Sequence, residues 1–180
     1  DQTAFHFLVA PGATANKYAN SQGRFGLEDG LCGYSTGGID AQGRPAPVSA
    51  AQLATIFVTA PGGVPAGSID LINDRDPRGP TRDMLSISPS SGRQDYNLDG
   101  AMCLRSLVTS DSPQARRVQE GIAQVRAKAD LHGKPTLILH GREDARVPAT
   151  FSSRPYLGLN ILREGAASQV RYIEITNINH

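Results

Sequence analysis

Apolar residues recur at regular spacing mainly in the last part of the chain, after about residue 110. Val118, Ile122 and Val125 lie on one face of a helix with 3.6 residues per turn. Ser112 stands at the N-cap of this helix, and the proline that follows it suits the first helical position. The pattern therefore predicts a helix over residues 113–129.

Two further apolar segments in this region are predicted strands. Thr136–Leu139 is a short, unbroken apolar run, which is typical of a strand buried on both faces of a parallel sheet. Val170–Ile175 is the second strand, and residues 150–163 between them can form a helix, although Pro155 and Gly158 weaken that expectation. The order helix, strand, helix, strand predicts a parallel α/β arrangement with right-handed crossovers.

Residues 1–110 have a different character, because they hold most of the 19 glycines and 12 prolines, which favour turns. Two short helices are expected within them. Ser49 and Gln52 form a capping box before an apolar stretch that contains Leu53, and Asp99 is placed to cap a second helix. We therefore divide the chain near residue 110, into an irregular region (1–110) and an α/β region (111–180).

Candidate catalytic residues follow the two predicted strands. Asp144 lies in the polar loop after the first strand, and His180 lies in the loop after the second. Ligands of parallel sheets bind outside the carboxyl ends of the strands, and neighbouring strands lie about 4.8 Å apart, so this carboxylate and this imidazole can meet. A carboxylate fixes the tautomer of a histidine that accepts a proton from a hydroxyl nucleophile. The chain order, acid before histidine, is that of α/β-hydrolases.

Each of these residues also has a simpler interpretation. An aspartate after a strand is often only a helix cap, and a histidine in a loop is usually a surface residue. Glu143 is a rival acid, but Asp144 fits the loop pattern His-Gly-x-x-Asp-x-x-Val-Pro better. We interpret His140 as a structural neighbour of the acid. The pair Asp144 and His180 is preferred because both residues fit one ordered pattern.

The string Gly-Tyr-Ser-Thr-Gly around Ser35 matches the nucleophile elbow of serine hydrolases, Gly-x-Ser-x-Gly. An elbow needs a buried strand before the serine and a helix after it. The residues before Ser35 are too interrupted by glycine and charge for a core strand, and glycines and a proline follow it. We therefore interpret Ser35 as a turn serine and expect the nucleophile outside this chain.

Composition excludes several classes of function. The net charge is +1, with 18 basic and 17 acidic residues in no block, which argues against nucleic acid and anionic membranes as partners. No apolar run approaches a membrane span. No metal-ligand spacing is present, and no cofactor is expected. Asp95–Gly100 resembles half of a calcium loop, but Ser106 replaces the bidentate glutamate.

The two cysteines and the two chain ends add context. Cys32 and Cys103 can form one disulfide in an oxidising compartment or remain two buried thiols, and the sequence leaves both open. The chain begins with Asp1 rather than methionine and stops at His180, just after a predicted strand. We expect it to be a piece of a longer protein.

Many segments resemble D-(−)-3-hydroxybutyrate oligomer hydrolases, bacterial esterases of polyhydroxybutyrate breakdown. The similarity covers nearly everything after about residue 14. The matching segments are Tyr18–Phe25, Leu31–Ser35, Ser88–Arg93, Asp95–Gly100, Cys103–Arg105, Gly133–Pro135, His140–Arg142, Ser153–Asn160 and Glu164–Gln169.

The resemblance implies a serine esterase that cleaves short D-3-hydroxybutyrate oligomers, small-molecule oligoesters, to monomers. Asp144 and His180 carry over as acid and base, and the serine lies upstream in a Ser-Asn-Gly-Gly setting, so this chain alone is expected to be inactive. Residues 1–110 become an insertion or lid before the C-terminal part of an α/β-hydrolase sheet. The implied location is secreted or periplasmic, with an intracellular one as the alternative.

Two other functions stay open from the sequence. One is a general carboxylesterase or feruloyl-esterase-like hydrolase with another acyl group. The other is a binding module that keeps the α/β-hydrolase fold without the chemistry. A nucleophile elbow in the upstream sequence separates an enzyme from such a module.

Overall fold

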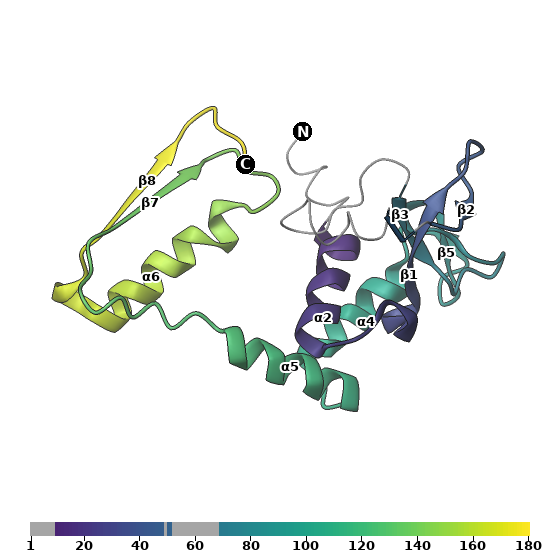
Figure 1. Cartoon of the computed structure of the whole chain (residues 1–180), viewed down its shortest axis with the longest axis horizontal. Helices are drawn as coiled ribbons and strands as arrows, with labels where there is room; N and C mark the ends of the chain where they lie inside the picture. Colours follow the sequence, from purple (N-terminus) through teal and green to yellow (C-terminus); the bar gives the residue numbers. More distant parts are fainter. Residues whose placement is uncertain (1–9, 49, 52–68) are drawn as a thin grey trace. The chain divides into compact units, whose positions relative to one another are not determined.

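The computed structural model describes residues 10–48, 50–51 and 69–180 and divides the chain into two compact units (Figure 1). The larger unit spans Leu8–Val125, and the smaller one contains Arg126–His180. The division thus falls after Val125 rather than near residue 110. The predicted capping box at Ser49 and Gln52 lies outside the described residues.

The larger unit combines helices with two small antiparallel sheets and is more regular than its glycine and proline content predicts. The first sheet has the strand order β2-β1-β3-β4, and β5 pairs with β6. The helices are η1 (Ala10–Thr14), α2 (Ala15–Gly23), η2 (Leu27–Asp29), η3 (Leu31–Gly33), η4 (Asp83–Leu85), α4 (Leu98–Thr109) and α5 (Pro113–Val125). The strands are β1 (Tyr34–Ile39), β2 (Pro45–Ala46), β3 (Ile69–Asn73), β4 (Thr81–Arg82), β5 (Ile87–Ser88) and β6 (Arg93–Gln94).

The core of this unit explains why α5 belongs to it. Val118 on α5 is buried in one apolar cluster with Ala19 of α2 and Leu104 and Leu107 of α4. A Cβ atom at Gly121 would lie 1.9 Å from the Gln22 carbonyl oxygen, so only glycine permits this approach of α2 and α5. Val118 and Ile122 of the predicted apolar face therefore pack in this core, whereas Val125 is 70% exposed. The helix ends at Val125 rather than Ala129.

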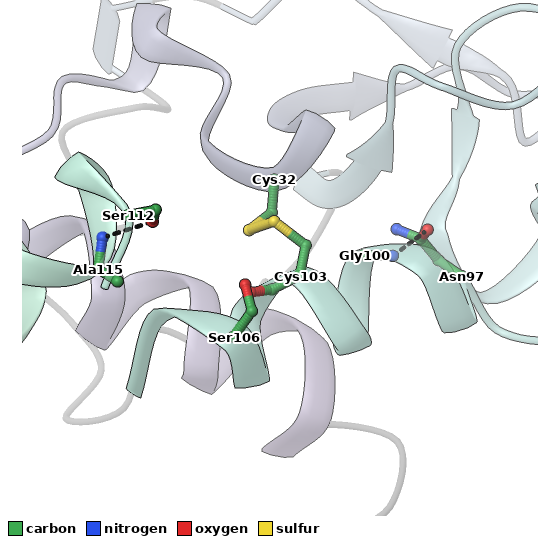
Figure 2. The surroundings of a disulfide bond; sticks show 7 residues. All are labelled: Cys32, Asn97, Gly100, Cys103, Ser106, Ser112 and Ala115. Carbon is green, nitrogen blue, oxygen red and sulfur yellow. Dashed lines mark hydrogen bonds between the residues drawn. A yellow bond between two sulfur atoms is a disulfide. The ribbon is translucent and has the colours of Figure 1, made fainter. Parts of the chain in front are cut away.

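Helix caps agree with the sequence at one position and differ at another (Figure 2). The Ser112 hydroxyl accepts the amide hydrogen of Ala115, which confirms the cap of α5. Helix α4 is capped by Asn97, whose side chain accepts the amide hydrogen of Gly100. The expected cap at Asp99 is wrong, because Asp99 is already inside the helix and its carboxylate binds Ser90.

A disulfide bond joins Cys32, in the turn before β1, to Cys103 on α4 (Figure 2). The two residues are 71 positions apart in sequence, and their Cα atoms are 5.6 Å apart. Both sulfur atoms lie within or against the apolar core of the larger unit. Of the two states that the sequence leaves open, the structure adopts the bridge.

Loss of this bridge should destabilise the larger unit. A loop of this length gives a stabilisation of about 4 kcal/mol in the chain-entropy model. We expect Cys32→Ala to lower the denaturant midpoint of unfolding as much as the double variant Cys32→Ala/Cys103→Ala, because either change breaks the same bond. Mass spectrometry without reductant provides the direct check, and two free thiols in oxidised protein would contradict the assignment.

The smaller unit contains two parallel strands and one long helix. Strands β7 (Thr136–Gly141) and β8 (Val170–Ile175) pair from Thr136 opposite Val170 to Gly141 opposite Ile175. The predicted parallel pairing is thus confirmed. Helix α6 (Ser153–Glu164) connects them, with the short helices η5 (Ala149–Phe151) before it and η6 (Gly165–Ala167) after it. Pro155 is tolerated because it lies in the first turn of α6.

The two faces of this sheet differ, and the prediction that β7 is buried on both faces is wrong for the described chain. Tyr172 and Glu174 lie on the face that contacts α6. On the opposite face Leu137 and Leu139 are 59% and 57% exposed, and Ile173 is 50% exposed. We name Leu137, Leu139, Ile173 and Ile175 the outer apolar face. A strand needs a layer on each side to be fully buried, and α6 provides only one.

Buried polar contacts fix the segment that leads into β7. The Asn160 side chain is fully buried, donates to the Ala129 carbonyl and accepts from the Ser168 hydroxyl. The Glu164 carboxylate accepts the amide hydrogens of Leu131 and Gly133. These bonds attach the C-terminal end of α6 to the chain before β7.

None of the helices in the described ranges is both long and apolar enough to span a membrane.

Candidate active site

The loops after β7 and β8 bring Asp144 and His180 into direct contact. The Nδ1 atom of His180 lies 2.8 Å from Oδ2 of Asp144, although the two residues are 36 positions apart in sequence. Asp144 is 7% exposed and His180 is 39% exposed at the side chain. A buried carboxylate thus holds an imidazole that solvent and ligands can reach.

The contact defines which nitrogen of His180 carries the proton. A carboxylate only accepts hydrogen bonds, so Nδ1 of His180 is the donor. In the neutral imidazole the other nitrogen, Nε2, then has a free lone pair. This tautomer can take a proton from a hydroxyl group, as the histidine of a catalytic triad does.

Asp144 is fixed on its other side by its own loop. Its Oδ1 atom accepts the amide hydrogens of Arg146 at 2.9 Å and Val147 at 2.7 Å. Burial alone would raise the pKa of Asp144, but the hydrogen bonds from Val147, His180 and Arg146 outweigh it and hold the pKa below its ordinary value of 3.8. Asp144 is therefore an anion throughout the neutral range.

His140 at the end of β7 is a second imidazole beside the acid. Its Nε2 atom lies 3.0 Å from the Val147 carbonyl oxygen and 3.6 Å from Oδ2 of Asp144. The shorter contact is the hydrogen bond. It connects the end of β7 to the far side of the loop that holds Asp144 (residues 142–148), which we name the acid loop. His140 therefore supports the acid loop, in agreement with its interpretation as a structural neighbour.

The residues after β8 (176–180), which we name the histidine loop, lie directly against the acid loop. The Ile178 carbonyl accepts the amide hydrogen of Glu143 at 3.1 Å, and the Asn179 side chain accepts those of His180 and Ala145 at 2.8 and 3.4 Å. A Cβ atom at Gly141 would lie 2.4 Å from the Ile178 carbonyl oxygen. The glycine at the end of β7 thus permits the approach that brings His180 to Asp144.

Asn179 and Gly141 were not identified from the sequence as parts of the site. The available signals were the place of Asn179 directly before the candidate base and the glycine of the loop pattern His-Gly-x-x-Asp-x-x-Val-Pro, which is Gly141. The rival acid, Glu143, meets the histidine loop through its backbone amide, and the carboxylate that contacts His180 is that of Asp144.

Ser35 belongs to the larger unit, whereas Asp144 and His180 belong to the smaller one. It lies in the antiparallel strand β1, opposite Ile72 of β3, and its hydroxyl donates to Asp74 at 2.9 Å. It is thus a strand serine rather than the turn serine expected, and no helix follows it to form an elbow. Within the smaller unit, over residues 126–180, the hydroxyls of Ser152, Ser153 and Ser168 are hydrogen-bonded to groups other than His180.

The described residues contain no group of three or more histidine, cysteine or acidic side chains arranged to hold a metal ion. In the segment that resembles half of a calcium loop, the Asp95 carboxylate accepts the hydroxyls of Ser88 and Ser91. Asn97 caps α4, and Asp99 binds Ser90. These oxygen atoms are engaged by hydrogen-bond donors and organise the turn before α4.

Comparison with known proteins finds the same family that the sequence segments resemble. The family model described as 3HB-oligomer hydrolase matches residues 2–180. Proteins named D-(−)-3-hydroxybutyrate oligomer hydrolase are 49% identical in Azoarcus sp. over 99% of this chain and 46% identical in Albidiferax ferrireducens over 100% of it. The protein of that name from Cupriavidus pinatubonensis is 46% identical over 91% of the chain.

The chain spans about a quarter of the length of these curated relatives, with matches that cover 26%, 26% and 23% of them. No solved structure is significantly similar to it. The family model spans residues 2–180, a range that includes Asp144 and His180, and the alignments with these relatives cover 91–100% of the chain. The chain therefore belongs to the 3HB-oligomer hydrolase family.

Proposed function

We propose that the full-length protein carrying this chain hydrolyses short D-3-hydroxybutyrate oligomers to monomers with a Ser-His-Asp triad. Asp144 is the acid, His180 is the general base, and the nucleophilic serine lies outside the chain. The observation that carries the proposal is the 2.8 Å contact between His180 Nδ1 and Asp144 Oδ2. The substrate class rests on the names of the relatives.

The chemistry follows from the tautomer of His180. Its Nε2 atom accepts the serine proton while the serine oxygen attacks the ester carbonyl, and the Asp144 carboxylate stabilises the imidazolium that forms. The tetrahedral intermediate then breaks its bond to the alkoxide, which takes this proton from the imidazolium and departs as a hydroxyl-ended product. The acyl group remains on the serine as an acyl-serine. Water then gives a proton to the same Nε2 atom and attacks the acyl-serine. The acyl bond to the serine breaks, the serine oxygen takes the proton back from the imidazolium, and the carboxylic acid is released.

The α/β-hydrolase fold is part of this proposal. Parallel strands are found almost only in sheets that are covered on both faces, and β7 and β8 have only one face covered by α6. We infer that further strands extend this pair and that a second layer covers the outer apolar face. The larger unit, which ends at Val125 and thus extends beyond the predicted region 1–110, then forms an insertion or lid between the serine-bearing part and the acid.

We propose a secreted or periplasmic location on the basis of the Cys32–Cys103 bridge, because disulfides persist mainly in oxidising compartments. An intracellular location is the alternative. It would predict two reduced thiols in protein taken directly from cells.

Active-site labelling tests the proposed mechanism. We expect a fluorophosphonate to modify the full-length protein at a serine outside these 180 residues, because Ser35 lies in an antiparallel strand without the helix that a nucleophile elbow needs, and the serines of the smaller unit are hydrogen-bonded to other groups. Peptide mapping by mass spectrometry locates the adduct. Ser35→Ala should keep full activity and labelling, and the isolated 180-residue chain should neither react nor hydrolyse esters above buffer. An adduct on Ser35 would refute the assignment of the nucleophile.

The substrate class is tested with the same full-length protein. We expect a higher kcat/KM for 3-hydroxybutyrate trimers than for butyrate or ferulate esters of similar size. A preference for the simple esters would favour a general carboxylesterase. No labelling and no turnover would favour a non-catalytic module.

A further inference from the structure

The Glu174 carboxylate on β8 accepts four hydrogen bonds from three side chains. It is 8% exposed at the side chain and accepts two hydrogen bonds from the Arg154 guanidinium, at 2.5 and 2.7 Å. It also accepts the Tyr172 hydroxyl at 2.8 Å and Nε of Arg142 at 3.2 Å. Arg154 and then Tyr172 outweigh the effect of burial and lower the pKa of Glu174 to about 2.

These donors come from both ends of the acid loop. Arg142 begins the loop, two residues before Asp144, and Arg154 lies in the first turn of α6, where the loop has ended. Tyr172 also contacts this turn, because its hydroxyl lies 3.0 Å from that of Ser153. Glu174 itself lies on β8, six residues before His180. One carboxylate thus connects the acid loop, at its start and after its end, with the strand that leads to the histidine.

We propose that Glu174 is a positioning residue that holds the acid loop and the histidine loop in the register that brings Asp144 to His180. The role rests on the proposed triad. Glu174 contacts neither Asp144 nor His180, so it acts through Arg142, Arg154 and the backbone of β8. We name Glu174, Arg142 and Arg154 the loop clamp.

The charge of Glu174 is needed because its main donors are cations. Hydrogen bonds between a guanidinium and a carboxylate are stronger than those between neutral groups, and the paired contact with Arg154 also fixes direction. Glutamine has the same size but only one acceptor oxygen and an amide that donates. It cannot accept from Arg154 on both side-chain atoms, and its amide would face a guanidinium.

We expect Glu174→Gln in the full-length enzyme to lower kcat by roughly tenfold with little change in KM. A displacement of about 1 Å in a catalytic group can cost about a hundredfold in rate, and the clamp is one of several contacts between the loops. A looser contact with Asp144 also stabilises the imidazolium of His180 less. The acidic limb of the kcat/KM profile should therefore move to lower pH.

Two further variants distinguish positioning from general stability. Glu164→Gln is the matched control, because Glu164 also accepts hydrogen bonds, but at the opposite end of α6, from Leu131 and Gly133. It should lower the melting temperature and leave kcat and the pH profile unchanged. Arg142→Gln changes an exposed residue, so the fold is retained, and it should reproduce part of the loss of kcat and of the shift in the pH profile.

The effect of the two changes together on kcat gives the final test of the loop clamp. Arg142→Gln should have almost no effect in a Glu174→Gln background, because both changes break the same contact. If Glu174→Gln does not fold, Arg142→Gln alone decides: wild-type kcat and pH profile would overturn the clamp. The clamp is also overturned if Glu174→Gln behaves like Glu164→Gln. Full activity in Asp144→Asn or His180→Ala would instead overturn the proposed triad.

Discussion

His180→Ala in the full-length protein is expected to abolish nearly all turnover while the fold is retained. Nε2 of His180 is the atom that accepts the serine proton in the proposed mechanism, and loss of a triad member costs several powers of ten in kcat. The side chain is partly exposed, so its removal leaves only a small packing defect. The melting temperature should stay close to that of the wild type.

Two other histidines provide graded controls. His132 is largely exposed and lies before β7, at the end of that strand away from the acid loop, so His132→Ala should keep full activity. His140→Ala removes the bond to the Val147 carbonyl and should lower kcat moderately. More than about a tenth of wild-type kcat in His180→Ala would exclude the triad.

Asp144→Asn is expected to lower kcat by about 10⁴-fold, as the equivalent change does in other triads. The asparagine oxygen can still accept the amide hydrogens of Arg146 and Val147, so the loop keeps its shape. The amide nitrogen then faces Nδ1 of His180 and donates to it. This contact favours the tautomer with the proton on Nε2, which cannot accept a proton from the serine.

Glu143→Gln is the control for this prediction, because the contact of Glu143 with the histidine loop is made by its backbone amide. It should change kcat far less than Asp144→Asn. The comparison is made from kcat and KM of both variants with a hydroxybutyrate trimer. A larger loss in Glu143→Gln would show that the acid is assigned to the wrong carboxylate.

Local patterns were sufficient to predict several elements of this chain. The Ser-Pro start of α5, the strand Val170–Ile175 and the parallel pairing of β7 with β8 all follow from short segments of sequence. The proximity of Asp144 and His180 was also predictable, because both residues follow strands of one parallel pair. Because paired parallel strands end at the same edge of a sheet, this contact could be predicted without the rest of the protein.

Other features depend on contacts that a local pattern does not contain. The apolar residues of β7 predicted burial on both faces, but burial depends on layers that other parts of a protein provide. Asn97 rather than Asp99 caps α4, because Asn97 adopts a left-handed backbone conformation that begins the helix earlier. The loop clamp was not predicted, because its residues come from a strand, a loop and a helix.

The outer apolar face has a practical consequence for the chain produced by itself. Leu137, Leu139 and Ile173 form an exposed apolar surface on a sheet of only two strands, in the part of the chain that the structure describes. The outer edges of β7 and β8 also offer backbone groups that another strand can bind. Such a surface favours self-association and precipitation at high concentration. Polar replacements on this face, such as Leu137→Lys, would favour a soluble monomer for spectroscopy while leaving the α6 side of the sheet unchanged.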